Sequence, residues 1–569
     1  MALTETIGSL HQVLVLAYGW LDRGSEEEQM TRPILLGLAV ALGTIPLLGL
    51  SADPPAPPTS GNVVDSLVIE FINEKIREQW QANGLTPSPV ASKHEFLRRV
   101  FLDIVGRIPT VDEINRMVNW PRPKIVQHLL HQDDYAENWA NLWTVWLLTR
   151  TNQPGIDRGK MHQWLKECFA ANKPYDRMVY ELLTASGRAD ENGAVNFILA
   201  HCGEQVPGEK RGEAGHFEMV PITSRTTRLF LGIQTQCTQC HDHPFLTERK
   251  QPEFWGINAF FRQVTRDPPV LQANGRQNAG VYYTLNDDMS LNPSGVILFE
   301  KRNGLLLPAM PTYFDGTKVS PQLKRREELA RLLIKDEFFA KAIVNRMWAH
   351  FMGRGFTKPV DDFGEHNPVS HPELLDRLAR DFAASGYDLK RLVTWICNSL
   401  PYQLTSAANK SNAKQDAEPF FARMLLKAMS PEQLVDSIFV ATNAEKTKAS
   451  ETEYLKMRET WLRTFTVNFG DDEGNEVTYN GTIIQALMLM NGRELNDAIK
   501  ARPGSTVQRA LTLPPSRRVH YLFLAALSRP PEAAELAVAN KIVSKLPPDQ
   551  ACQDILWALL NSNEFILNH

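Results

Sequence analysis

The chain has 569 residues, of which 43% are hydrophobic and 22% are charged, a composition that excludes an intrinsically disordered protein. Its length accommodates about two to four domains. The 61 basic and 65 acidic residues nearly balance at a net charge of −4, so the sequence lacks the strong positive charge of a nucleic-acid-binding protein. We therefore expect no nucleic-acid partner.

An uncharged apolar run at residues 33–50 predicts export. Arg32 precedes the run, as a positive charge precedes the apolar core of a secretory signal. Because the acidic residues 26–28 do not suit the start of such a signal, translation is expected to begin at Met30. The run also just reaches the length of a membrane span. We therefore expect residues 1–52 to be a signal peptide or a membrane anchor, and the remainder to be extracytoplasmic, either periplasmic or secreted.

The segments after this run predict helices. A Pro-rich linker occupies residues 53–61, and apolar residues at helical spacing over residues 64–76 predict an amphipathic helix after it. Thr110 and Glu113 have the spacing of a capping box, which predicts the start of another helix.

Three tryptophans form a stripe in residues 135–151. Trp139, Trp143 and Trp146 are spaced by four and three residues, which places them on one face of a helix. Such a stripe packs in a core or lines a cofactor pocket.

The strongest chemical signal is C-x-x-C-H, at Cys237, Cys240 and His241. In this motif two thiols bond covalently to the vinyl groups of a haem, and the adjacent imidazole ligates the iron. We expect residues 229–239 to form a helix that ends with the motif, because Pro244 limits the residue before it. In a helix, the three side chains would face one ligand. The sequence therefore predicts one covalent haem c, a cofactor attached outside the cytoplasm.

The same stretch allows two other interpretations. Cys237, Cys240, His241 and His243 are four ligand types that zinc accepts, although structural zinc sites usually draw on two separated pairs. Alternatively, the cysteines and histidines form a structural clip without any cofactor. The other cysteines are widely spaced and are expected to be buried thiols, with one disulfide as an alternative.

Candidates for the distal iron ligand lie upstream of the motif. They are Met219, His216 and His201, and a methionine ligand would favour electron transfer, whereas an open site would favour reaction with a substrate. His243 lies too close to His241 to reach the opposite haem face, so we interpret it as a proton donor or a supporting residue.

The second half of the chain is also expected to be helical. A helix is predicted at residues 252–264, and short alternating runs predict a small β element within residues 266–320. Helical periodicity returns from residue 325 and continues, apart from a polar loop, to residue 565. Ser370 and Glu373 have capping-box spacing at the start of one of these helices. The predicted fold is mainly α, with two packed helical regions and a small β element between them.

A second polar cluster lies within this helical half. It contains two adjacent carboxylates and three histidines that could bind a hard cation or act as an acid–base pair. The alternative is that the carboxylates cap or pair with the helix that carries Arg346 and that His371 only begins the next helix. The cluster comprises Arg346, His350, Asp361, Asp362, His366 and His371, of which Asp361, Asp362 and His371, together with His243, are the candidate catalytic residues.

Several long stretches resemble a family of large exported planctomycete proteins. In that family a cytochrome-C-type signature domain of unknown function precedes a C-terminal partner domain of unknown function. The resemblance covers residues 62–569 and implies a signature domain at 62–265, a β-containing connector at 266–320 and a partner domain at 321–569. The matching stretches are residues 101–109, 230–232 and 237–245 in the first part and 345–355, 359–363, 370–375 and 554–565 in the second.

Together these features predict an exported c-type haem protein with a redox function, either a haem oxidoreductase or an electron carrier. The length of the chain favours the enzyme, since electron transfer alone needs far less protein. The alternative function is a non-haem binding or scaffold protein in which the Cys/His cluster is a zinc site or a clip. The redox partner and the substrate are not specified by the sequence.

Overall fold

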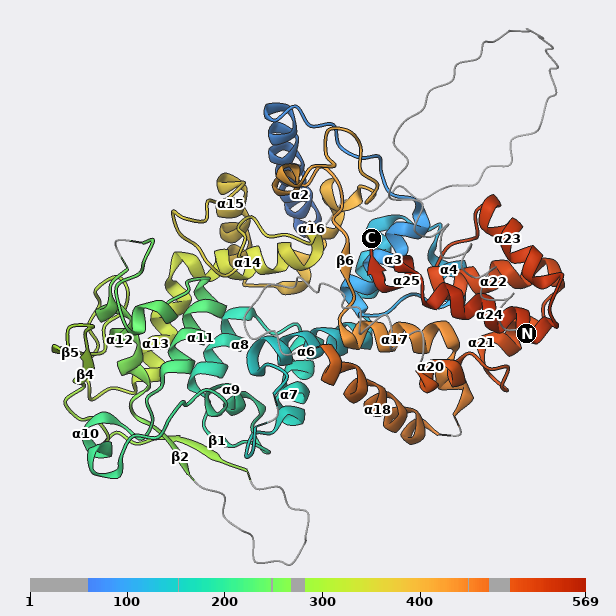
Figure 1. Ribbon diagram of the computed structural model, residues 1–569. Helices are drawn as coiled ribbons and strands as arrows, with labels where there is room; N and C mark the ends of the chain where they lie inside the picture. Colours follow the sequence, from blue (N-terminus) through green and yellow to red (C-terminus); the bar gives the residue numbers. More distant parts are fainter. Residues whose placement is uncertain (1–59, 152, 247–248, 268–281, 449, 470–491) are drawn as a thin grey trace, which may run out of the picture. The chain divides into compact units, whose positions relative to one another are not determined.

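The computed structural model describes residues 60–569 except 152, 247–248, 268–281, 449 and 470–491 (Figure 1). The predicted signal or anchor at residues 1–52 and most of the linker at 53–61 lie outside the described residues. The chain divides into two compact units, Met1–Leu67 and Val68–His569, and of the first the structure describes only the start of helix α2. The second unit holds the rest of α2 and every other described helix and strand.

The described chain is mainly α-helical, as predicted. The α-helices up to the β-rich segment are α2 (Ser60–Ala82), α3 (Lys93–Val105), α4 (Val111–Met117), α5 (Arg122–Leu129), α6 (Asp133–Leu148), α7 (Arg158–Ala170), α8 (Tyr175–Thr184), α9 (Asn196–Leu199), α10 (Arg211–Ala214), α11 (Val220–Leu231) and α12 (Gln251–Asn258). Those beyond it are α13 (Arg325–Lys335), α14 (Glu337–Met352), α15 (Pro372–Ala384), α16 (Leu389–Asn398), α17 (Pro431–Thr442), α18 (Glu451–Phe469), α20 (Arg493–Ala498), α21 (Thr506–Leu511), α22 (Pro515–Leu527), α23 (Ala533–Val543), α24 (Pro548–Leu560) and α25 (Asn563–Ile566).

Short 3-10 helices and strands connect the α-helices. The 3-10 helices are η2 (Gly193–Val195), η3 (Gly208–Lys210), η4 (Gln236–Gln239), η5 (Ala259–Phe261), η6 (Pro401–Gln403), η7 (Gln415–Phe420) and η8 (Ala444–Thr447). The strands are β1 (Gly187–Arg188), β2 (Val264–Asp267), β3 (Thr284–Asp287), β4 (Ile297–Glu300), β5 (Leu306–Ala309), β6 (Lys427–Ala428) and β7 (Leu567–Asn568). All strand pairs are antiparallel, in the sheet order β1-β3-β2 and in the pairs β4-β5 and β6-β7.

Local sequence explains many helix boundaries, but not all. The capping box of Thr110 and Glu113 is confirmed at the start of α4. The one predicted from Ser370 and Glu373 is wrong, because His371 occupies the N-cap position of α15 without a side-chain cap. Glu373 instead lies 2.9 Å from the ammonium of Lys75.

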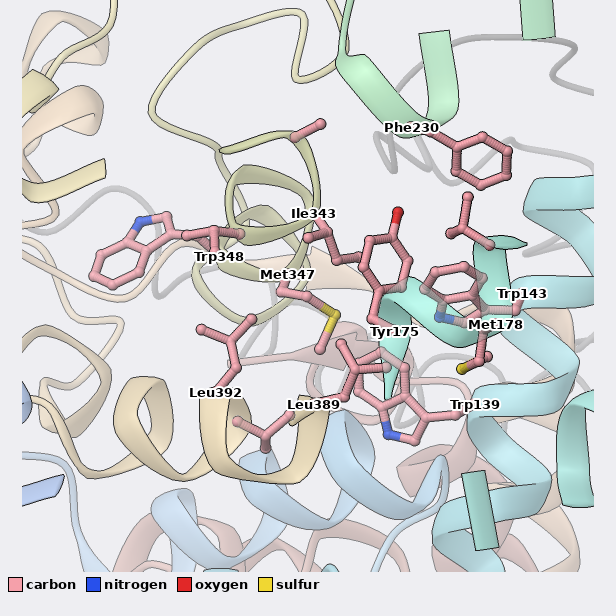
Figure 2. Close-up of a cluster of buried hydrophobic side chains, with 14 of the residues drawn as sticks. Trp139, Trp143, Tyr175, Met178, Phe230, Ile343, Met347, Trp348, Leu389 and Leu392 are labelled. Atoms are coloured by element: carbon pink, nitrogen blue, oxygen red, sulfur yellow. The ribbon is translucent and has the colours of Figure 1, made fainter. Parts of the chain in front are cut away.

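One hydrophobic core extends from Val68 to Met424 and so includes helices on both sides of the β-containing segment. Trp139 and Trp143 of α6 are buried in it, together with Tyr175 of α8 and side chains of α11, α14 and α16 (Figure 2). Helix α11 packs beside α14, which places the residues after each helix close to one another (Figure 1). This packing brings the segment with the C-x-x-C-H motif close to part of the second polar cluster.

A second core lies in the C-terminal part. Helices α17, α21, α22 and α24 pack on one another, and two residues of the N-terminal part, Leu102 and Ile108, join their core. The hydrophobic cores therefore divide near residue 425, whereas the predicted domain boundary at residues 320–321 runs through the first core.

Within the described residues, no helix combines the length and the apolar character needed to cross a membrane.

Candidate functional site

The C-x-x-C-H motif lies in a tight turn after α11, and the predicted helix over residues 229–239 is wrong in its second half. Helix α11 ends at Leu231 because Gly232 takes a left-handed conformation with φ of 65° and closes the helix as its C-cap. Cys237 falls in the short 3-10 helix η4, and Cys240 follows it as the C-cap. The motif is therefore presented by a loop between α11 and α12.

The two motif cysteines differ from the other four. Cys237 and Cys240 are exposed free thiols, whereas Cys168, Cys202, Cys397 and Cys552 are buried. Burial raises the pKa of Cys168 to about 11 and that of Cys202 to about 12, which suppresses their thiolate forms. The predicted buried thiols are confirmed, and the described cysteines form no disulfide. The accessible sulfurs among the six cysteines are therefore those of the motif.

The two histidines of the loop are hydrogen-bonded in opposite ways. His241 Nδ1 lies 2.6 Å from the carbonyl oxygen of Asp242, and since a carbonyl only accepts, Nδ1 carries the proton. His243 Nδ1 instead accepts the backbone N–H groups of Phe245 and Leu246 at 3.2 and 3.0 Å. In the neutral ring, that nitrogen carries no proton, so Nε2 carries it. His241 thus presents a lone pair at Nε2, and His243 an N–H.

Hydrogen bonds to helix α12 hold the part of the loop that contains Gln239 and Asp242. The side chain of Asp242 accepts the backbone N–H of Gln251 at the start of α12, at 2.9 Å, and this bond is the main cause that lowers the pKa of Asp242. The carbonyl of Gln239 accepts from the side chains of Gln251 and Trp255 at 3.0 and 3.1 Å. Of the aromatic residues of α12, Trp255 therefore contacts the motif, while Phe254 is buried in the interior.

The second cluster contributes a loop that follows α14. Asp361 is buried, with its Oδ2 2.5 Å from Arg228 Nε on α11 and 3.7 Å from Arg346 on α14. Its Oδ1 accepts from Gln234, which precedes the motif, at 3.5 Å. The carboxylate thus pairs with the helix that carries Arg346, as the alternative interpretation of the cluster predicts.

His366, which pairs with Asp362, meets the motif loop directly. His366 Nε2 lies 2.9 Å from Asp362 Oδ2, so the ring N–H donates to the carboxylate. The His366 ring stacks on Phe245, with centroids 5.8 Å apart and planes at 25°, and lies 5.7 Å from the ring of His243. Two clusters that are far apart in the sequence therefore form one site.

The other two histidines of the second cluster lie elsewhere. His350 Nε2 lies 3.1 Å from the carbonyl oxygen of Asp103, and His371 Nδ1 lies 2.9 Å from Ser370 Oγ. Both are buried, and burial lowers the pKa of each to about 4. His371 packs among aromatic rings, including those of Phe356 and Phe421. We interpret both as neutral interior histidines.

The distal candidates are placed in and around the main core. His201 Nε2 lies 2.8 Å from the carbonyl of Leu147, and burial lowers its pKa to about 4. Met219 is 1% exposed, and its backbone N–H donates to the carbonyl oxygen of Cys202. The ring of His216 lies 6.4 Å from that of Phe217. Among the described residues, no hydrogen bond or ring contact joins these three candidates to the motif.

Within the described part of the chain, no three His, Cys, Asp or Glu side chains converge on a common metal position. The tryptophan stripe borders a cavity of about 10 Å³, lined by Trp143, Trp146 and Arg346 among others. This volume is below the roughly 300–1,000 Å³ of most cofactor pockets, so the core-packing interpretation of the stripe is favoured.

The residues that join the two clusters carry no local signal in the sequence. Arg228 and Gln234 stand out only through contacts with residues more than a hundred positions away. Phe245 lies in the matching stretch 237–245, but its contact with His366 is visible only in the fold. Gly232 is the exception, since a glycine after an apolar helical run indicates a C-cap and a sharp change of direction.

Two family models match the chain. The first is PSCyt2, a protein of unknown function (DUF1549), at residues 71–266, and the second is PSD1, a protein of unknown function (DUF1553), at residues 325–543. No curated protein and no solved structure matches this chain. The motif loop lies in the PSCyt2 region, and Asp361, Asp362 and His366 lie in the PSD1 region. The chain therefore belongs to the family in which a cytochrome-C-type PSCyt2 domain is followed by a PSD1 partner domain, both of unknown function.

Proposed function

We propose that the protein is an exported c-type haem protein with a redox function. Cys237 and Cys240 would hold the haem through two thioether bonds, and His241 would ligate its iron. The observation that supports this proposal is the opposite hydrogen bonding of the two histidines in the motif loop, since it leaves a lone pair on Nε2 of His241 and an N–H on Nε2 of His243.

His241 is oriented as an iron ligand requires. A metal-bound imidazole usually donates its second ring N–H to a carbonyl or a carboxylate, which fixes the tautomer and the orientation of the ring. The bond from His241 Nδ1 to the Asp242 carbonyl has this character at 2.6 Å. Nε2 then carries the lone pair that would bind iron.

His243 is oriented against metal binding. With two backbone N–H groups donating to Nδ1, the proton of the neutral ring is on Nε2, so neither nitrogen offers a free lone pair to a metal. A tetrahedral zinc site in this loop would need His243 as its fourth ligand beside Cys237, Cys240 and His241. The hydrogen bonds therefore favour haem, which needs only the other three residues.

The exposure of Cys237 and Cys240 supports covalent attachment, because sulfurs in a surface loop can reach the vinyl groups of a macrocycle. Once bound, the haem would supply one-electron oxidation and reduction. The protein's own side chains hold the segments of the site together. Asp242 fixes the loop to α12, and Asp361 joins α11 to the loop that carries His366.

An absorption spectrum tests the proposal. The full chain is produced in the presence of a cytochrome c maturation system and then extracted with acid acetone, which removes non-covalent haem. We expect a Soret band that stays with the protein after extraction. A colourless protein that contains one zinc per chain would instead support the binding or scaffold function, and a colourless protein without metal would support the structural clip.

A further inference from the structure

We propose that His366, held by Asp362, is a positioning residue for the loop of residues 237–246. The PSD1 region would thus complete a site whose cofactor-binding residues all lie in the PSCyt2 region. The consequence for haem rests on the proposed function, whereas the positioning of the loop does not.

The two loops first meet at a backbone contact. The N–H of Phe363 donates to the carbonyl of Gly232 at 2.7 Å. A Cβ atom at position 232 would lie 2.7 Å from the ring of Phe363, so the residue must lack a side chain for the segments to approach this closely. The end of α11 and the loop after α14 are therefore in direct contact.

A second contact is made at position 364. A Cβ atom on Gly364 would lie 2.8 Å from the ring of His366 and 2.9 Å from Leu246 Cδ1. Glycine thus lets the PSD1 loop fit between its own histidine and the end of the motif loop.

The orientation of His366 is fixed on two sides. Its Nε2–H donates to Asp362 Oδ2, and one face of the ring stacks on Phe245. The Asp362 side chain is only 14% exposed, and the backbone carbonyl of the same residue accepts from Asn367 at 2.8 Å. Since aromatic stacking and a charge-assisted hydrogen bond each restrict the ring, His366 provides a defined surface rather than a mobile side chain.

That surface supports the part of the loop that holds the histidine hydrogen bonds. Phe245 is 70% exposed, so its ring has the His366 imidazole as a stacking partner rather than a surrounding core. The backbone N–H of Phe245 also donates to His243 Nδ1. Loss of His366 therefore removes one of the two ring contacts of Phe245, leaving that with His243, and is expected to weaken the hydrogen bonds that His243 accepts.

Three variants of the full chain test this inference without haem. Amide hydrogen exchange is measured at Phe245 and Leu246 in apo-protein. His366→Ala is expected to speed exchange at these two amides about tenfold and to leave the core helices unchanged. His366→Phe keeps an aromatic ring and should restore much of the protection. Glu365→Gln, an exposed neighbour, is the control and should behave like the wild type.

A second measurement uses haem-loaded protein. We expect His366→Ala to shift the reduction potential and His366→Phe to return it toward the wild-type value, an effect that general destabilisation would not produce. If His366→Ala leaves exchange at Phe245 and Leu246 unchanged, the positioning role is contradicted. If exchange changes but the wild type carries no haem, the proposed function fails and the positioning role stands.

Discussion

Lys427 Nζ lies 2.5 Å from Asp103 Oδ1, and the two side chains are only 10% and 2% exposed. Asp103 also accepts from Tyr402 and Asn568 at 2.7 Å each, and Lys427 donates to two carbonyls at the end of α14. Strand β6, which begins at Lys427, pairs with the C-terminal strand β7. This ion pair thus connects helix α3 with both ends of the C-terminal helical region.

Lys427→Met is expected to lower the free energy of unfolding by about 3–5 kcal/mol, because it leaves the Asp103 carboxylate buried without its counter-ion. Chemical denaturation measures the loss. Lys500→Met removes a lysine from an exposed pair with Asp497 and is the matched control, with an expected change of about 0.5 kcal/mol or less. Equal effects of the two substitutions would show that the buried pair has no special role.

Stability is expected to fall in mild acid because of neutral buried histidines. Burial lowers the pKa of His350 and His371 to about 4, below the ordinary value of 6.5, so the unfolded state binds more protons between these limits. Their contribution is present above pH 6.5 and is lost as the pH falls toward 4. We expect each of these two histidines to lower the free energy of unfolding by about 2 kcal/mol as the pH falls from about 7 to about 5.

The variant His371→Phe isolates the contribution of one of these two histidines to the pH dependence of stability. His371 Nε2 is buried without a hydrogen-bond partner among the described residues, and the ring lies among aromatic side chains. Phenylalanine fits such surroundings and does not titrate, so the variant should lose less stability than the wild type between about pH 7 and pH 5. Urea unfolding at both pH values measures the difference, and an unchanged pH dependence would contradict the assignment.

Gly364→Ala is expected to disturb the contact between the two loops of the site. The added Cβ would meet the His366 ring and Leu246 at less than 3.0 Å, so one of them must shift. The expected cost in unfolding free energy is about 1–3 kcal/mol, with faster amide exchange at Leu246. Gly208→Ala is the control, because a Cβ there meets nothing within 4 Å. Identical behaviour of the two variants would argue against close packing at Gly364.

The double substitution Cys237→Ala and Cys240→Ala is expected to abolish covalently held haem, since both thioether bonds are lost. Gln236→Ala changes an exposed neighbour in the same turn and should retain the pigment. Haem content after acid-acetone extraction distinguishes the two. Covalent pigment in the double variant would overturn the assignment of these sulfurs.

Local signals in the sequence predict local structure well. The mainly α fold and the Thr110–Glu113 capping box depend on residues a few positions apart, and both are confirmed. The predicted helix through the motif is wrong because Gly232 already closes α11, well before Pro244 could end it.

Contacts between residues far apart in the chain could not be predicted from the sequence. Neither the contact of His243 with His366 nor that of Arg228 with Asp361 leaves a periodic pattern, since both arise from the packing of α11 on α14. Likewise, Glu373 has capping-box spacing but pairs with Lys75 of a distant helix. The composition of each cluster could be predicted, but not that two of them form one site.

The most direct test of the central claim is the intact mass of the mature native protein under denaturing conditions. We expect the mass of the polypeptide increased by one haem, with the added mass on the peptide that contains Cys237 and Cys240. A mass equal to that of the polypeptide alone would contradict covalent attachment.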